Sequence, residues 1–371
     1  MYLHFKTWVR ITWLMLFHKP RPRRILFFIG FALLFGLVFI IVAFFRLLDE
    51  IFFPRYRKQK IKEPVFIFGN PRSGTTFLYD LMALDKKKFT QPILYQTLFC
   101  SITLYKAIGL IIKIDKRIGR PIKYCVNKFN QFFIRYEGIH RVSMDKPEED
   151  EPLFFLSLTS PTLWLICPYP KELSYLEICD NLPTKTRRRI MKYYKRSLQR
   201  FMYMFGKNRT YLCKNVFSTG KIDMITSTFP DARIIYPIRH PYKAIPSLVS
   251  FFRTAWKLHS PKIKEKSPET RAVARLCINY YKHIFKNRHK WAKKNFIVIR
   301  FDDLVKNPNA TIINIYKKLG VRITPAYTRA LNKFVKEQER YKSKHKYLLE
   351  EFGLSKKTIS KELKQFINSY L

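Results

Sequence analysis

The sequence predicts an α/β fold with three layers around a central parallel sheet, preceded by a transmembrane helix. Short apolar runs rich in β-forming residues alternate with stretches of helical spacing, which is typical of a parallel sheet covered by helices on both faces. A glycine-containing turn follows the first of these runs, and an uncharged stretch near the N-terminus is long enough to cross a bilayer. The 371 residues suffice for one large α/β domain behind that stretch, which we place at residues 63–371.

The N-terminal segments are assigned from apolarity and charge. Residues 25–45 carry no charge, and at about 1.5 Å per residue they extend for about 30 Å, so we predict a single transmembrane helix over residues 25–47. Residues 1–24 mix aromatic and aliphatic residues with basic ones, which predicts an amphipathic interfacial segment or a second, poor membrane segment. The charged stretch 48–62 is interpreted as a juxtamembrane linker.

The chain is strongly basic: 71 Lys and Arg face 26 Asp and Glu, for a formal charge of +45. Such a balance fits nucleic acid, an anionic membrane or anionic ligands. The basic residues are spread along the whole chain without a nucleic-acid-binding motif, so we expect no nucleic-acid partner. The six cysteines show no metal-binding spacing, and we predict no metal site. Free cysteines and a basic domain favour the cytoplasmic face of the membrane, with a Golgi-lumen type II arrangement as the alternative.

The stretch 65–82 is a strand, a turn and a helix start. Residues 65–68 (VFIF) form the apolar run, Gly69 to Gly74 form the turn, and helical spacing begins at Thr75. Backbone N–H groups at such a helix start favour a bound anion. The spacing is P-loop-like, but Thr75 occupies the position of the nucleotide-binding lysine and the cation is Arg72 instead. The loop therefore suits one phosphate that carries a transferable group better than a triphosphate with Mg²⁺.

The sequence PRSGTT at 71–76 resembles the 5′-phosphosulfate loop of sulfotransferases that use 3′-phosphoadenosine 5′-phosphosulfate (PAPS), in the form found in the bacterial-type, membrane-linked branch. The resemblance implies PAPS as the donor. It also implies that the 5′-phosphate is bound by the loop residues Arg72, Ser73, Gly74, Thr75 and Thr76.

An acidic run follows a mostly helical region at 84–135. Pro147 precedes four consecutive acids, Glu148 to Glu151, which fits a helix N-terminus in which the acids complement the helix dipole. The same run is a candidate for catalysis, because Glu148, Glu149 or the nearby His140 could take the proton from an acceptor hydroxyl.

Three further strands are expected at 211–213, 233–238 and 296–301. The first ends at Lys214. The second ends at Arg239, and a helix carrying Ser247 follows it. Because ligands bind beyond the carboxyl ends of parallel strands, we expect Arg72 and Arg239 to lie at one edge of the sheet.

The block 214–247 resembles the family's 3′-phosphate motif, with Arg239 and Ser247 on its two phosphate-binding positions, and the acidic run and the C-terminal KSKHKYLLEEFGL also look like bacterial-type members. One departure is that relatives often have a histidine after the lysine that corresponds to Lys214, whereas this chain has Ser218. The base is therefore expected elsewhere, as His140 or in the acidic run, or activity is altered.

The expected reaction is transfer of a sulfuryl group from PAPS to a hydroxyl or amine. Arg72 and Lys214 are the candidates to stabilise the charge on the leaving oxygen. The membrane segment makes a lipid or glycan acceptor plausible. The alternatives are a P-loop kinase or NTPase, and an inactive membrane-anchored member of the fold.

Overall fold

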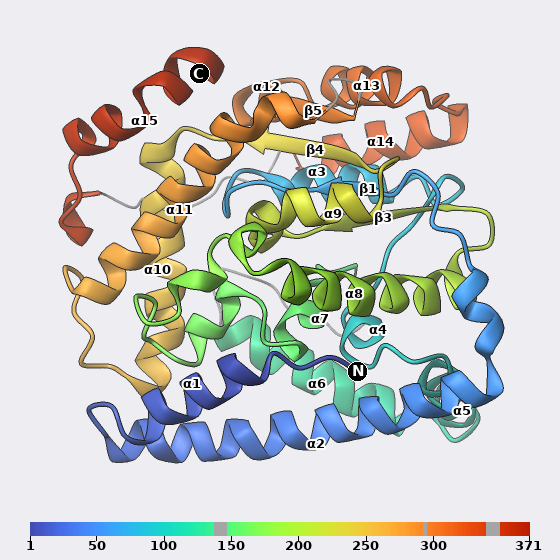
Figure 1. Ribbon diagram of the computed structural model, residues 1–371. Helices are drawn as coiled ribbons and strands as arrows, with labels where there is room; N and C mark the ends of the chain where they lie inside the picture. The colour runs from blue at the N-terminus through green and yellow to red at the C-terminus, as the bar shows by residue number, and fades with distance from the viewer. Residues whose placement is uncertain (137–146, 292–294, 339–348) are drawn as a thin grey trace.

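The central element is a parallel five-stranded sheet with strand order β2-β3-β1-β4-β5 (Figure 1). The computed structural model describes residues 1–136, 147–291, 295–338 and 349–371. The strands are β1 (Val65–Ile67), β2 (Phe89–Thr90), β3 (Thr210–Lys214), β4 (Arg233–Ile238) and β5 (Phe296–Arg300). β1 lies between β3 and β4, with Ile67 opposite Lys214 on one side and Ile235 on the other. The expected parallel sheet is thus confirmed, and β2, which is only two residues long, is an addition.

Each face of the sheet has its own apolar core, because successive side chains of a strand point to opposite faces. Val65 and Ile67 join a core with helix α3 (Thr75–Ala83) and the C-terminal helices α13 (Pro308–Leu319) and α14 (Pro325–Gln338). Phe66 and Phe68 join a larger core with α8 (Thr184–Phe205), α10 (Pro241–His259) and α11 (Pro268–Asn287). Figure 1 shows α13 and α14 on one side of the strands and α8 on the other. The molecule therefore has the three layers expected for this fold class.

The helices are bounded as follows. They are α1 (Phe5–Leu16), α2 (Pro22–Phe52), α3 (Thr75–Ala83), α4 (Leu94–Leu98), α5 (Ile102–Arg117), α6 (Pro121–Tyr136), α7 (Glu151–Leu156), α8 (Thr184–Phe205), α9 (Ile222–Thr228), α10 (Pro241–His259), α11 (Pro268–Asn287), α12 (Phe301–Lys306), α13 (Pro308–Leu319), α14 (Pro325–Gln338) and α15 (Lys356–Tyr370).

The N-terminal helices differ in extent from the sequence expectation. α2 runs from Pro22 to Phe52, beyond both ends of the predicted segment 25–47 and into the predicted linker 48–62. The helix continues there because Asp49 and Glu50 pair with Arg200 of α8, so the acids are satisfied within the helix. Within the described residues, α2 is the one helix that is long and apolar enough to cross a membrane.

Candidate functional site

The site is built around the turn between β1 and α3. Gly74 has φ +82°, a left-handed conformation that glycine adopts without strain, and an added Cβ there would lie 2.6 Å from the Phe301 ring. A Cβ on Gly69 would lie 3.2 Å from the Pro237 carbonyl oxygen, so the turn passes close to β4. Arg72 also has a positive φ of 70°, which is uncommon for a non-glycine residue and is found at functional sites. The turn thereby directs the first backbone N–H groups of α3 to the carboxyl edge of the sheet.

Arg72, Arg239 and Ser247 come together at one side of this turn. Arg239 follows β4, and its Nη1 donates a hydrogen bond of 2.8 Å to the Arg72 carbonyl oxygen. The Nε of Arg72 donates to the Ser247 hydroxyl at 3.2 Å. Burial and the neighbouring Arg72 charge lower the pKa of Arg239. Two guanidinium groups held this close repel each other, and a bound anion would relieve that repulsion.

The same cluster holds buried polar atoms that still need partners. The Arg239 Nε is buried and makes no hydrogen bond to the described residues, although its guanidinium lies over the Phe301 ring at 4.5 Å. The Ser73 hydroxyl lies beside Tyr281 but makes no hydrogen bond of ordinary geometry there. Unsatisfied buried donors are costly, so these atoms fit the oxygens of a phosphate group.

Lys214 occupies the opposite side of the turn, at the end of β3. Its side chain is only 3% exposed, and its Nζ lies 3.0 Å from the Thr76 hydroxyl and 3.2 Å from the Glu149 carboxylate. Burial lowers the pKa of Lys214, but Glu149 and Glu148 outweigh this effect and raise it. The ammonium group therefore stays charged beside the first turn of α3.

The acidic run divides between the site and the core. Glu148 and Glu149 precede α7 and lie beside Lys214, whereas Asp150 and Glu151 are buried among other polar groups. The Glu148 N–H donates to the Pro92 carbonyl oxygen at 3.1 Å, which fixes the backbone next to β2. Burial raises the pKa of Glu148 to about 7, although the Lys214 charge opposes the shift.

Asp150 and Glu151 have structural partners instead. Asp150 accepts hydrogen bonds from Tyr194, from Tyr211 at 3.3 Å and from Asn215 at 2.8 Å. Glu151 accepts from Ser160, and from Thr162 at 2.7 Å. α7 starts at Glu151 with Asp150 as its N-cap, so Glu151 is the one acid of the run in the first helical turn, and the proline in that turn is Pro152 and not the expected Pro147.

Comparison with known proteins identifies this arrangement. A family model described as "Sulfotransferase family" matches residues 64–325, which contain all three cation-bearing strand ends. The chain belongs to the sulfotransferase family. Omega-hydroxy-beta-dihydromenaquinone-9 sulfotransferase Stf3, from Mycobacterium bovis and Mycobacterium tuberculosis, is 24% identical over 320 residues, which are 84% of this chain and 77% of the relative. The resemblance to bacterial-type sulfotransferases is thereby confirmed.

Solved sulfotransferase structures have the same fold. The sulfotransferase STF9 from Mycobacterium avium superposes with a TM-score of 0.71 at 16% identity, covering 88% of this chain and 81% of STF9. The sulfotransferase STF1 from Mycobacterium tuberculosis H37Rv gives a TM-score of 0.66 at 17% identity, with 88% and 83% coverage.

Most of the residues predicted for this sulfotransferase site come together in the structure. Arg72, Ser73, Gly74, Thr75 and Thr76 surround the turn, Arg239 and Ser247 lie on its β4 side, and Lys214, Glu148 and Glu149 lie on its β3 side. His140 lies outside the described residues. Among the described residues, no group of three or more His, Cys, Asp and Glu side chains could hold a metal ion.

The segment after Lys214 is the one in which relatives often have a histidine and this chain has Ser218. The Asn215 side chain caps the turn Val216–Lys221 and donates to Asp150, so this segment is held against the core. The Ser218 hydroxyl is buried without a hydrogen-bond partner in the described structure. Among the described residues, the carboxylates of Glu148 and Glu149 are two of the titratable groups that the structure brings close to Lys214.

Sequence reasoning missed two aromatic residues of the site. Phe301, the residue after β5, lies against both Gly74 and Arg239. Tyr281 on α11 donates to the Arg239 carbonyl oxygen at 2.7 Å and lies beside Ser73. Phe301 could have been found from its place at a strand end, whereas nothing in the spacing of α11 points to Tyr281.

Proposed function

We propose that the chain transfers a sulfuryl group from PAPS to a hydroxyl or amine acceptor. The observation that carries the proposal is the placement of three cations at the carboxyl ends of three adjacent parallel strands, with Arg72 after β1, Lys214 as the last residue of β3 and Arg239 after β4. Each lies at the glycine turn, and two of them border buried donors that lack partners. These features suit a ligand with two anionic ends.

The two sides of the turn have different tasks in this proposal. Arg239, Ser247 and the Arg72 guanidinium would hold the 3′-phosphate, because guanidinium groups bind phosphate oxygens with paired donors. The backbone N–H groups of Ser73 to Thr76 would hold the 5′-phosphate at the start of α3. The direct contact between Arg72 and Ser247 makes Arg72 a residue that both phosphate sites share.

On the β3 side of the turn, Lys214 and the carboxylates of Glu148 and Glu149 would carry out the chemistry. When bound, PAPS supplies an activated sulfuryl group attached to the 5′-phosphate. The acceptor oxygen or nitrogen forms a bond to sulfur while the bond from sulfur to the phosphate oxygen breaks and leaves the electron pair on that oxygen. Lys214 stabilises this charge, helped by Arg72. These cations supply the positive charge that the transfer needs, so we expect no requirement for Mg²⁺.

Glu148 is the general base in this proposal. A base is most effective when its pKa is close to the working pH, and Glu148 has a pKa of about 7 in a buried position near Lys214. Glu149 forms the ion pair with Lys214 and so positions the ammonium group beside Thr76. A general base contributes typically about 10²–10⁴-fold to the rate.

We infer that the acceptor is a membrane-borne lipid or glycan and that the domain works at the cytoplasmic face of a membrane. The relative Stf3 is named for a hydroxylated menaquinone, and this chain carries a long apolar helix next to its catalytic domain. All six cysteines are free, which agrees with a reducing compartment.

The proposal is tested by calorimetry with 3′-phosphoadenosine 5′-phosphate (PAP), the product of the donor. We expect PAP to bind the full chain more tightly than ADP or ATP. Arg239→Ala and Arg72→Ala should each weaken PAP binding by at least about tenfold, because each removes charge-assisted hydrogen bonds. Arg275→Ala is the matched control, since Arg275 pairs with Glu362 on the surface away from the turn. Wild-type affinity in both site variants would refute the assignment.

Activity is tested separately by mass spectrometry of membrane extracts. Cells that contain the chain should accumulate a product heavier by one sulfuryl group, and cells with Arg239→Ala should not. PAP binding without any such product would favour the inactive member of the fold.

A further inference from the structure

We propose that the chain docks on the surface of an anionic lipid bilayer through one continuous apolar surface, with α2 lying in the plane of the membrane instead of crossing it. We call this surface the membrane face. It consists of exposed apolar side chains on α1, α2 and α5, namely Phe5, Val9, Trp13, Leu26, Ile29, Leu33, Leu37, Ile40, Phe44, Leu47, Ile51, Leu110, Ile111 and Ile114.

α2 has a buried stripe along its length and an exposed apolar stripe on the opposite side. Phe28, Phe35, Val42 and Asp49 recur every seven residues and are buried against the domain. The exposed stripe from Leu26 to Ile51 recurs at intervals of three and four residues on the other side of the helix. Leu33 is 71% exposed and Ile40 is 67% exposed, so these side chains contact nothing that would remove them from water.

The start of α2 is bonded to the catalytic domain. The Arg24 Nε donates to the Ser260 hydroxyl at 2.9 Å, and its Nη1 donates to the Tyr169 hydroxyl. The neighbouring Arg23 donates to the Leu258 carbonyl oxygen at 2.8 Å. Arg24 is only 4% exposed, so this end of the helix is held by a buried charge.

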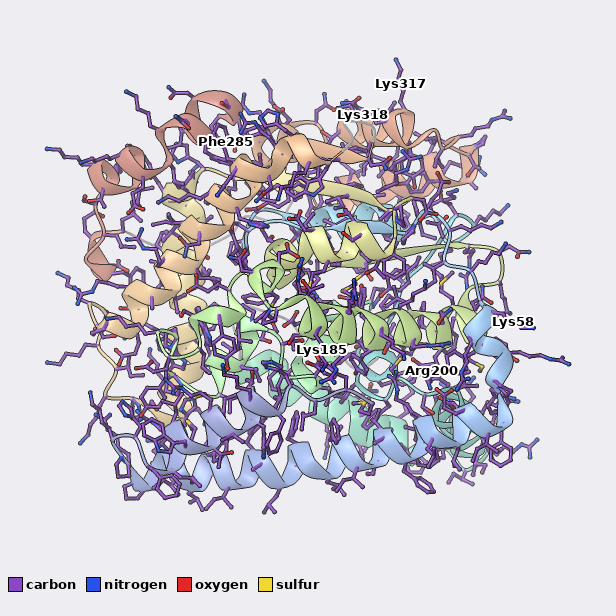
Figure 2. The ribbon with its side chains drawn as sticks, in the orientation of Figure 1. Lys58, Lys185, Arg200, Phe285, Lys317 and Lys318 are labelled. Carbon is purple, nitrogen blue, oxygen red and sulfur yellow. The ribbon has the colours of Figure 1, made fainter. Side chains whose placement is uncertain are left out.

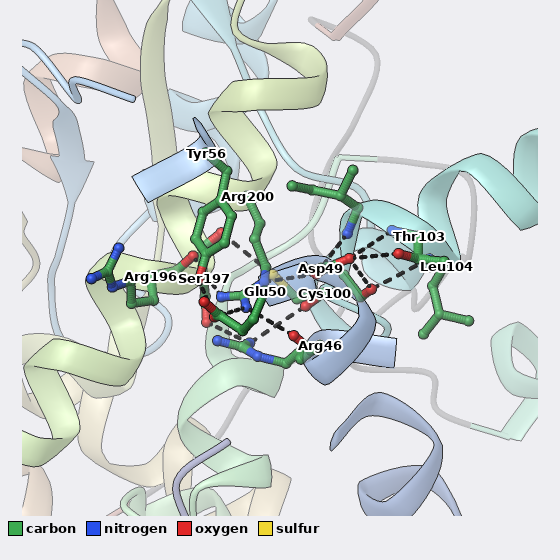
Figure 3. Close-up of polar contacts among 12 residues, drawn as sticks. Arg46, Asp49, Glu50, Tyr56, Cys100, Thr103, Leu104, Arg196, Ser197 and Arg200 are labelled. Atoms are coloured by element: carbon green, nitrogen blue, oxygen red, sulfur yellow. Dashed lines mark hydrogen bonds and ion pairs between the residues drawn. The ribbon is translucent and has the colours of Figure 1, made fainter. Parts of the chain in front are cut away.

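The end of α2 is bonded to the same domain through a denser network (Figure 3). Asp49 is fully buried, pairs with Arg200 of α8 at 2.8 Å and accepts from the Thr103 backbone N–H at the start of α5 at 2.8 Å. Arg46 donates to the Ser197 hydroxyl at 2.9 Å. Removing either partner of such a buried pair is strongly destabilising.

These two attachments decide how α2 can meet a membrane. At about 1.5 Å per residue, Arg24 and Asp49 are roughly 37 Å apart along the helix axis. Both are bonded to one catalytic domain, and Figure 1 shows α2 along one edge of it with α1 beside it. A helix that crosses the bilayer must leave the domain on one side, which would break one of these attachments. A helix lying on one leaflet keeps both of them and buries the exposed stripe.

The charges around the membrane face favour anionic lipid over a second copy of the chain as the partner that covers it. Basic side chains border the membrane face and are exposed: Lys6, Arg10, Lys19, Arg21, Lys106, Lys113, Lys116 and Arg117. The acidic side chains on these three helices are otherwise engaged: Asp49 and Asp115 are buried, and Glu50 pairs with Arg57 and Arg200. A second copy would bring the same positive border, whereas anionic headgroups complement it.

The decisive experiment is cysteine labelling of the full chain in sealed membrane vesicles with a membrane-impermeant maleimide. The native exposed thiol is removed by Cys125→Ser, and the other five cysteines are buried. Lys19→Cys places a thiol before α2 and Lys58→Cys places one after it, and both positions are exposed. Figure 2 shows Lys58 pointing away from the domain. We expect both thiols to react with maleimide from the same side of the vesicle. Adding detergent should leave the extent of labelling at each thiol unchanged. Reaction from opposite sides would overturn the proposal.

A second measurement tests the membrane face itself. The variant Leu33→Glu/Leu37→Glu/Ile40→Glu should float at least about tenfold less with phosphatidylcholine–phosphatidylglycerol vesicles than the parent chain does, because it places charges on the apolar stripe that meets the lipid. Ile313→Glu, on exposed α13, should bind as the parent does. Circular dichroism confirms that each variant is folded. Unchanged flotation of the triple variant, with loss of a dimer by light scattering, would show that a second copy covers this face.

Discussion

Neighbouring carboxylates in the acidic run differ in pKa and in hydrogen-bond partners because different groups surround them. Glu148 is next to Glu149 in sequence, yet burial raises its pKa to about 7 while Glu149 pairs with Lys214. Asp150 is also buried, and burial raises its pKa, but three donors satisfy it: Tyr194, Tyr211 and Asn215. The Glu148 carboxylate accepts a long hydrogen bond of 3.4 Å from the Glu149 backbone N–H in place of three side-chain donors, so it is better suited to exchange a proton.

Replacing Glu148 by Gln should separate stability from activity. The pKa of Glu148 is about 7 in the folded chain, against an ordinary value of 4.5, so the folded chain holds this proton more tightly between these pH values. The free energy of unfolding of the wild type should therefore fall by roughly 3 kcal/mol as pH rises from 4.5 through about 7. Glu148→Gln cannot ionise, so urea unfolding should show it to be more stable than wild type at about pH 8, with little difference at about pH 4.5.

The activity of the same variant gives the functional half of this prediction. Wild-type turnover should rise with pH through about 7, because the base must be ionised to accept a proton. Glu148→Gln should lose roughly 10²-fold or more of the turnover and lose this pH dependence, while PAP affinity stays unchanged. A variant that keeps the wild-type pH profile would assign the base to another side chain.

The turn between β1 and α3 is packed against the ends of two other strands. Its conformation depends on Gly74, whose neighbour across the turn is the Phe301 ring from the end of β5. The same ring lies under the Arg239 guanidinium. The ends of β1, β4 and β5 are thus packed into one unit. A change in the turn should therefore shift the guanidinium groups of Arg72 and Arg239.

Gly74→Ala is expected to damage both the fold and PAP binding. An alanine there has an unfavourable positive φ and a Cβ 2.6 Å from Phe301, so we expect a loss of about 2–4 kcal/mol from backbone strain and overpacking together. Gly320→Ala is the matched control, because Gly320 also has a positive φ of 66° but open space around it, and should cost about 1 kcal/mol. Urea unfolding measures the loss of stability in each of the two variants, and calorimetry measures PAP binding. Equal losses would mean that the contact with Phe301 has no energetic weight.

The N-terminal helices and the catalytic domain form one packed body. Trp8 of α1 stacks on Phe35 of α2, with ring centroids 5.4 Å apart, and Phe28 and Phe35 belong to the same apolar core as Phe66 of β1. Basic side chains such as Lys317 and Lys318 project outward in Figure 2, whereas Arg200 is buried within the body. Most of the positive charge therefore lies on the surface, and the Arg200 charge inside is paired with Asp49.

Separating Asp49 from Arg200 should destabilise the whole molecule. Arg200→Met leaves the buried Asp49 carboxylate without its cation and should cost about 3–5 kcal/mol by urea unfolding. Asp49→Asn leaves the buried Arg200 with Glu50 as its remaining acidic partner, so it should cost less than Arg200→Met does. The double variant should cost less than the sum of the two, which a double-mutant cycle measures. Arg57→Met, which breaks an exposed pair with Glu50, should cost at most about 1 kcal/mol. Strictly additive losses would show that the pair is not coupled.

The sequence alone determined the parallel sheet, the glycine turn after its first strand and the cations at its strand ends. These features depend on local spacing: apolar runs predict strands, and Gly69 to Gly74 predicts a turn after the first of them. Because parallel strands end at one edge of a sheet, their order in the chain is enough to place Arg72, Lys214 and Arg239 near one another.

Only the tertiary structure decided which acids reach the site and how α2 is held. Glu148 and Asp150 have the same local sequence context, but Tyr211 of β3 and Tyr194 of α8 donate to Asp150, whereas Glu148 lies beside Lys214 at the end of β3. The uncharged stretch of α2 looks the same whether it crosses a bilayer or lies on one. Its attachments to Ser260 and Arg200 are contacts between residues far apart in the chain, which no local pattern encodes.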